Sequence, residues 1–239
     1  MTDWPALRDV YGSAADVPAL LDDAASATEW DAPAWRELSQ RLYNQGTVAP
    51  ASYAALPALA EIARSRADLA LDPALFLAAS IIASNDGPPE IGDVRGLYAA
   101  QITALRPVAE CKLELVAERA DVLYALEVLA AFEDLSVWQR NLDRLVDEEV
   151  ELECPSCDDH IYLELVDGEL VATADPDVDG DGQPVQAADP TGLGTAEVRL
   201  LALCRAHNHT AVASELLQLF GQATCPHCGA RFSIAEALA

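Results

Sequence analysis

Apolar side chains recur every three or four residues over most of the first 148 positions, which is the spacing of one face of an α-helix. The clearest of these stripes are Trp35-Leu38-Leu42, Tyr53-Leu56-Leu59-Ile62 and Leu75-Phe76-Ala79-Ile82. Prolines stand near several of the predicted helix starts, where the missing backbone N–H costs nothing. The pattern predicts a succession of helices over residues 1–148, the last of them running from Ser136 to Val146.

The helical part contains a repeated pattern. Val17-Pro18-Ala19-Leu20 matches Leu56-Pro57-Ala58-Leu59, 39 positions later. An Asp that can cap a second helix follows each copy, and these are Asp31 and Asp72. A third copy is predicted from Arg106-Pro107, with Asp121 before its second helix. Two helices in a period of about 40 residues are typical of HEAT-type solenoids.

Residues 41–57, Arg-Leu-Tyr-Asn-Gln-Gly-Thr-Val-Ala-Pro-Ala-Ser-Tyr-Ala-Ala-Leu-Pro, resemble a segment of uncharacterised bacterial HEAT-like helical repeat proteins. Some proteins of that kind are suspected immunity or accessory proteins. The resemblance covers about residues 10–135 and implies an α-solenoid of antiparallel helix pairs. It brings no functional residues with it.

After residue 148 the apolar period changes to two, which indicates strands. Val150, Leu152 and Cys154 alternate with glutamates, and two further alternating runs, 160–166 and 169–173, flank Asp167-Gly168 as in a β-hairpin. Helical patterns return at 195–204 and 212–220, and a short strand is expected at 230–234. We therefore expect a mostly α protein, with a HEAT-like repeat domain at 1–148. At 149–239 we expect a small β zinc ribbon that an inserted helix pair interrupts.

Four of the six cysteines form two Cys-x-x-Cys pairs, Cys154/Cys157 and Cys225/Cys228. Four thiolates complete a tetrahedral zinc site, so we predict a structural zinc ion, with rubredoxin-like iron as the nearest alternative. Gly229 can adopt the positive φ that such a knuckle needs. A redox dithiol fits two matched pairs less well. The 67 residues between Cys157 and Cys225 exceed the usual spacing within a compact ribbon.

Other metal patterns are weaker. His160 and His227 lie close to the pairs, and we expect them outside the ligand set. Asp177, Asp179 and Asp181 match the first half of a calcium loop, but Ala188 replaces its final Glu, so an exposed acidic turn is expected, with weak calcium binding as the alternative.

The remaining cysteines and the aromatic residues are interpreted structurally. Cys204-Arg205-Ala206-His207-Asn208-His209 is read as a helix end rather than a second metal cluster. Cys111 and Cys204 stand in apolar helical contexts and are expected to be buried thiols. Trp30, Trp35, Tyr43 and Tyr53 are expected in the core, and one or two of them could line a binding face.

Charge narrows the functional classes. The chain has 40 acidic and 14 basic residues, a net charge of −26, and Lys112 is its single lysine. Such a field repels nucleic acid and attracts basic proteins, although solubility alone accounts for much of it. No apolar run is long enough to span a bilayer and no secretory signal is visible, so a cytoplasmic location is expected.

These observations favour a non-enzymatic protein-binding scaffold that engages a basic partner, and a bacterial immunity or accessory protein is one concrete form of this prediction. The alternative is a metal-dependent enzyme at the junction of ribbon and solenoid, using His160, His207 or His209. Nucleic-acid binding through the ribbon ranks last, because residues 151–239 contain only three bases, Arg199, Arg205 and Arg231. The sequence does not predict the oligomeric state.

Overall fold

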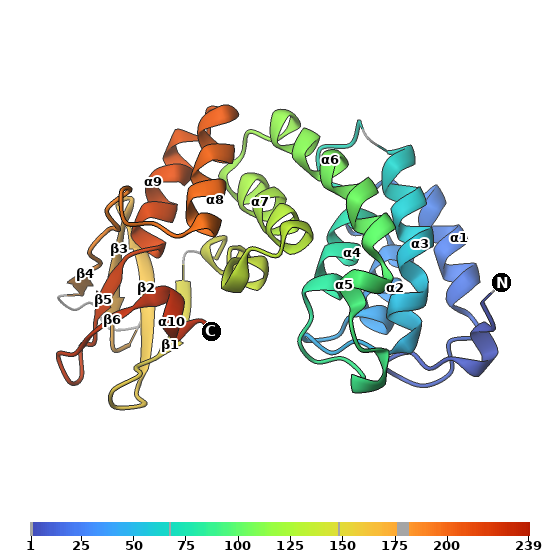
Figure 1. The fold of residues 1–239 in the computed structure, drawn as a ribbon, viewed down its shortest axis with the longest axis horizontal. Helices are drawn as coiled ribbons and strands as arrows, with labels where there is room; N and C mark the ends of the chain where they lie inside the picture. Colours follow the sequence, from blue (N-terminus) through green and yellow to red (C-terminus); the bar gives the residue numbers. More distant parts are fainter. Residues whose placement is uncertain (1, 67, 148, 176–181) are drawn as a thin grey trace. The chain divides into compact units, whose positions relative to one another are not determined.

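The computed structural model describes residues 2–66, 68–147, 149–175 and 182–239. By its internal contacts the chain divides into two compact units (Figure 1). Unit 1 consists of Met1–Val116 with Ala131–Asp134, and unit 2 of Ala117–Ala130 with Leu135–Ala239. The division into a repeat domain at 1–148 and a ribbon at 149–239 stays a prediction.

Unit 1 is helical over its described residues. Its helices are α1 (Val17–Ser26), α2 (Pro33–Leu42), α3 (Pro50–Ser65), α4 (Pro73–Ala83), α5 (Val94–Leu97) and α6 (Ala99–Leu115), with short 3₁₀ helices η1 (Trp4–Ala6) and η2 (Pro89–Ile91). Proline occupies the first or second position of α1 to α4, where its fixed φ suits the first turn. Asp72 caps α4 as expected, because its carboxylate accepts the N–H of Ala74 at 3.0 Å.

The core of unit 1 lies between helix pairs. Helix α1 packs against α2, α3 against α4, and α6 against α3, as Figure 1 shows from blue to green. The side chains that this packing removes completely from water include Trp35, Leu38, Leu42, Leu56, Leu59, Ile81, Leu105 and Leu113. The apolar stripes predicted for α2, α3 and α4 are therefore confirmed as their buried faces, except that Phe76 of α4 is only half-buried.

Two buried cations in unit 1, Arg66 and Lys112, bind backbone carbonyl oxygens. Lys112 reaches from α6 and donates to the carbonyl oxygens of Arg66 (3.0 Å) and Leu69 (2.6 Å). The Arg66 guanidinium in turn donates to the carbonyl oxygens of Ala24 (2.8 Å) and Ala25 (2.5 Å), at the end of α1. The carbonyl oxygens of Ala24 and Arg66 also accept the backbone N–H groups of Ala27 and Leu69, so the two cations add a second hydrogen bond to carbonyls near the ends of α1 and α3.

Unit 2 combines helices with small antiparallel sheets. It contains most of α7 (Arg119–Glu133), the 3₁₀ helices η3 (Ser136–Arg140) and η4 (Asp143–Leu145), and α8 (Thr195–Ala206), α9 (Thr210–Leu219) and α10 (Ile234–Ala237). Arg119 joins three of these elements, since its Nε lies 2.8 Å from Glu215 of α9 and its Nη2 donates to the carbonyl oxygen of Leu145 at 2.7 Å. Trp138 is fully buried and its ring lies 4.7 Å from that of Phe220.

The strands of unit 2 are β1 (Glu149–Glu153), β2 (His160–Val166), β3 (Glu169–Thr173), β4 (Gln183–Pro184), β5 (Gln222–Thr224) and β6 (Arg231–Ser233). The first four form one antiparallel sheet in the order β1-β2-β3-β4, and β5 pairs with β6. Asp167 and Gly168 have φ of 52° and 86° between β2 and β3, so the predicted hairpin is confirmed with the two positive φ values of a type I′ turn. Gln186 and Gln222 exchange two backbone hydrogen bonds of 2.9 Å and so link the end of β4 to β5.

The structure is mostly helical with small antiparallel sheets, in agreement with the coarse prediction, and helices α8 and α9 stand where the inserted pair was expected. The predicted helix from Ser136 to Val146 is wrong, because two short 3₁₀ helices occupy that segment. The third predicted helix pair, α6 with α7, is divided between the two units. A solenoid is not established by these observations.

Candidate metal centre

The first Cys-x-x-Cys pair forms the turn between β1 and β2. The N–H of Cys154 donates to the carbonyl oxygen of Asp159, and the N–H of Asp158 donates to the carbonyl oxygen of Cys154, both at 2.9 Å. Asp158 has a φ of 59°, in the left-handed region. These bonds close a tight knuckle in which both cysteine side chains leave the same turn.

The second pair repeats this geometry between β5 and β6. The N–H of Cys225 donates to the carbonyl oxygen of Ala230, and the N–H of Gly229 donates to the carbonyl oxygen of Cys225, again at 2.9 Å. Gly229 has a φ of 74°, which confirms the role predicted for it. Asp158 is its equivalent in the first knuckle, and the sequence did not single it out, although Asp tolerates this backbone conformation better than most residues.

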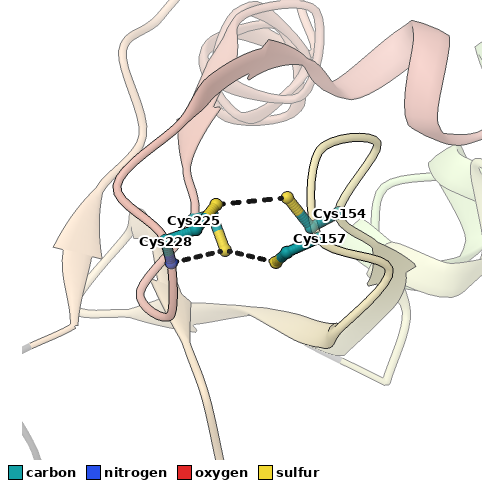
Figure 2. Close-up of side chains that lie close together, drawn as sticks. All are labelled: Cys154, Cys157, Cys225 and Cys228. Carbon is teal, nitrogen blue, oxygen red and sulfur yellow. Dashed lines mark hydrogen bonds between the residues drawn. The ribbon is translucent and has the colours of Figure 1, made fainter.

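The two knuckles bring all four sulfur atoms together (Figure 2). Every pair of these Sγ atoms lies within 4.8 Å, and Cys154–Cys228 and Cys157–Cys225 are each separated by 3.8 Å. A regular tetrahedron around zinc, with Zn–S bonds of about 2.3 Å, has edges of about 3.8 Å. A disulfide bond requires about 2.05 Å, so the cysteines are free thiols that could hold a metal ion.

Backbone N–H groups point at the sulfur atoms in both knuckles. Ser156 donates to Cys154 Sγ at 3.4 Å and Cys228 donates to Cys225 Sγ at 3.5 Å. Burial raises the pKa of Cys154, but the N–H groups of Ser156 and Cys157 and the adjacent thiols outweigh burial and lower this pKa to about 7. Burial and the neighbouring thiols raise the pKa of Cys225. A bound cation would favour the thiolate form of the whole set.

The cluster lies at the surface of unit 2, with Cys154 and Cys225 buried, Cys157 half-buried and Cys228 exposed. His160 and His227 are both exposed and lie outside the cluster, as expected. His160 Nδ1 lies 2.9 Å from Glu151, and the Nε2 of His227 lies 3.2 Å from the carbonyl oxygen of His160. Neither imidazole therefore belongs to the four-sulfur cluster.

The weaker sequence patterns do not form a second cluster among the described residues. His207 and His209 stack at 6.4 Å, and Cys204 is buried, which raises its pKa to about 12. Cys111 is exposed, so the prediction of a buried thiol is wrong there, because α6 turns this position away from its packed face. Asp177, Asp179 and Asp181 lie outside the described residues.

Comparisons with protein-family models, with curated proteins and with solved structures find no match to this chain. Among the described residues no helix combines the length and the apolarity needed to cross a membrane. A function for this chain therefore has to be inferred from its own geometry.

Proposed function

We propose that Cys154, Cys157, Cys225 and Cys228 bind a structural zinc ion that holds unit 2 together, in a non-enzymatic, HEAT-like scaffold that binds a protein partner. The observation that carries the metal proposal is the spacing of the four sulfur atoms, which matches a zinc–sulfur tetrahedron at two of its edges. Soft sulfur donors in this number favour zinc or iron over hard cations.

A structural role follows from the number of ligands. A catalytic zinc site keeps one position for water or substrate, whereas four cysteines fill a tetrahedron. The backbone N–H groups that point at the sulfurs also offset thiolate charge, as expected for a closed site. These features support a stabilising metal over a metal-dependent enzyme.

The ion would fasten two segments that are far apart in sequence. One knuckle joins β1 to β2, and the other, beyond helices α8 and α9, joins β5 to β6. Strands β5 and β6 pair over only three residues, so metal binding would supply part of the free energy that keeps this short pair in place beside the β1–β2 knuckle.

Charge supports a basic protein as the partner. The outer side of β1 exposes Glu149, Glu151 and Glu153, while Val150 and Leu152 face inwards. Glu149 also lies directly opposite Glu164 of β2, and like charges in this position repel each other. A cationic surface placed against the strands would relieve that repulsion. A toxin-neutralising immunity protein is one concrete form of this role.

The metal proposal is tested by elemental analysis of purified protein and by cobalt(II) substitution, because four thiolates give cobalt a distinctive charge-transfer absorption. About one zinc ion per chain is expected. The Cys228→Ser variant should lose it, and Cys111→Ser, which removes an exposed cysteine outside the cluster, should retain it. Iron in the same site would correct the metal but keep the ligands. A metal-free protein with its full melting temperature would refute the proposal.

The partner proposal needs a separate test. Basic proteins captured on the immobilised chain are identified, purified and measured again by calorimetry. Association should weaken as salt rises to about 0.5 M, because screening shortens the reach of the acidic field. The triple change Glu149→Gln, Glu151→Gln, Glu153→Gln should weaken it, whereas Glu61→Gln, Glu114→Gln, Glu118→Gln, at exposed acids of the helical part, should not. An affinity that changes neither with salt nor in the Glu149→Gln, Glu151→Gln, Glu153→Gln variant would contradict the proposal.

A further inference from the structure

The outer face of α2 separates two cavities in unit 1. Helix α2 buries Trp35, Leu38 and Leu42 and exposes Arg36 and Gln40. One cavity has a volume of about 580 Å³ and the other about 360 Å³, and both are lined by Arg36 and Gln40. A ligand that crosses this exposed ridge would therefore reach both cavities.

The smaller cavity has aromatic walls. Trp30, Trp35, Pro73 and Phe76 line it, and Trp30, 42% exposed, meets Phe76 edge to face at 5.3 Å. Trp35 is fixed behind them, because its Nε1 donates to the carbonyl oxygen of Ala27 at 2.9 Å. Rings held in this way offer apolar surface with little conformational entropy to lose on binding, which suits a bulky apolar side chain.

The larger cavity lies between α2 and the 9–13 loop, and the loop is fixed in place. Arg41 Nε contacts the Asp9 carboxylate at 2.6 Å, and the other end of the guanidinium donates to the carbonyl oxygen of Ser13 at 2.9 Å. Asp9 also accepts the N–H groups of Tyr11 (2.9 Å) and Gly12 (2.7 Å). Tyr11, 66% exposed, is consequently presented on an ordered loop at this cavity.

Arg36 supplies a positive charge where the two cavities meet, while Asp31 lines the smaller cavity and Glu37 the larger. Within the part of the chain that the structure describes, its guanidinium has no hydrogen-bond or ion-pair partner, whereas Arg41, five residues on, is satisfied by Asp9 and Ser13. A guanidinium fork matches a carboxylate in shape and charge. Arg, Trp and Tyr are also the residue types that dominate binding energy at protein interfaces.

We propose that this face of α2 docks a peptide segment of a partner protein, with a bulky apolar side chain in the Trp30–Phe76 cavity and a neighbouring carboxylate paired with Arg36. A peptide fits better than a compact small molecule, because the two cavities lie on either side of a ridge and an extended chain can occupy both. The surface belongs to unit 1 and does not depend on the metal centre or on the acidic strands.

The test uses a random heptapeptide library displayed on phage and selected on the purified full-length chain. The selected sequences should place an aromatic or large aliphatic residue beside Asp or Glu. A selected peptide is then synthesised with a fluorophore, and its binding is measured by fluorescence polarisation. Arg36→Glu should weaken binding at least about tenfold, since it replaces a charge-assisted bond by repulsion, and Arg36→Lys should weaken it less.

A control variant and two variants of Trp30 complete the test. Arg205→Glu makes the same charge change at an exposed position of α8 and should leave the affinity unchanged. Trp30→Ala should abolish binding and Trp30→Phe should partly restore it, with circular dichroism confirming that each variant is folded. Failure to enrich any sequence, enrichment of Lys or Arg beside the apolar residue, or insensitivity to Arg36→Glu would overturn the proposal. A chain that sediments as a dimer, and as a monomer after Trp30→Ala, would assign the surface to a second copy instead.

Discussion

Glu127 is a carboxyl group of α7 that is only 8% exposed. Its Oε2 accepts the backbone N–H of Asp143 at 2.8 Å, at the start of η4. Burial, followed by the nearby Asp143 carboxyl, raises the pKa of Glu127 to about 8, and burial also raises the pKa of Asp143. Arg144 favours ionisation of Asp143, whereas Asp147 opposes it. The pair is therefore most stable when one of the two groups holds a proton.

This pair predicts a stability that falls as the pH rises. A pKa of about 8 in the fold, against 4.5 for the free group, means that the contribution is fully present below about pH 4.5 and is lost as the pH approaches 8. Glu127→Gln keeps an acceptor for the Asp143 N–H but cannot ionise. Relative to the wild type, its free energy of unfolding should rise by about 1–3 kcal/mol between about pH 6 and pH 8.5.

Urea unfolding of zinc-saturated protein, followed by tryptophan fluorescence, measures this difference. Glu118→Gln removes one exposed acid close to the same helix and controls for the change in net charge. If the stability curves of wild type, Glu127→Gln and Glu118→Gln run parallel over this pH range, Glu127 is ionised in the fold and the interpretation is wrong.

Sequence reasoning at the residue scale succeeded where one residue type has one strong chemical preference. The four cysteines converge as predicted, and Gly229 adopts its expected positive φ. Asp158 was missed because Asp adopts the left-handed conformation in only a minority of its positions, so a single Asp without a following Gly does not predict a positive φ. The Glu127–Asp143 pair could not be found among 40 acidic residues, since only the fold shows which two are removed from water together.

Gln218 of α9 ties that helix to the β2–β3 hairpin. The side chain is 7% exposed, its Oε1 accepts the N–H of Leu170 at 2.6 Å, and its Nε2 donates to the carbonyl oxygen of Gly168 at 3.0 Å. Gln218→Met retains the size of the side chain but leaves both backbone groups without this partner. Since an unsatisfied buried group costs about 1–3 kcal/mol, the free energy of unfolding should fall by about 2–3 kcal/mol.

Chemical denaturation compares Gln218→Met with Gln222→Met, an exposed position in β5. Amide exchange should locate the loss, because the N–H of Leu170 would exchange faster than its neighbours in β3. A drop in stability equal to that of the Gln222→Met control would show that solvent satisfies these groups and that Gln218 does not hold the hairpin.

At the scale of elements, the sequence predicted β1, the β2–β3 hairpin and β6, but it missed β4 and β5 and misread the segment after α7. Trp138, Leu142 and Leu145 have helical spacing and are all buried. Yet Asp134 and Ser136 have φ of 58° and 53°, which an α-helix does not allow. The N–H of Asp143 is bound by Glu127 rather than by a helical carbonyl. A hydrogen bond to a side chain of α7 therefore replaces a backbone hydrogen bond of the predicted helix. The spacing of apolar residues in the sequence cannot predict such a contact.

For the molecule as a whole, the resemblance to HEAT repeats covered about residues 10–135, but the contacts divide these residues between two units. The first two helix pairs pack within unit 1, but most of α7 belongs to unit 2, together with the strands. The repeat spacing of about 40 residues describes where helices begin, whereas the partners of each helix depend on which apolar faces meet. The sequence pattern did not show which apolar faces meet.

If the proposed metal is bound, the division into units predicts which strands and helices lose stability when it is removed. Only unit 2 contains the four cysteines, and the ion would link the β1–β2 knuckle, whose strands pair over five residues, to the β5–β6 knuckle, whose strands pair over three. A chelator that strips the ion should therefore raise amide exchange in β1, β2, β5 and β6, while α3 and α4, with an apolar core of their own, keep their protection. Hydrogen exchange with mass spectrometry, run with and without chelator, measures both effects in one sample. Adding zinc back controls for irreversible damage. If amide exchange rises equally in α3 and β2, the metal stabilises the whole chain cooperatively rather than unit 2 alone.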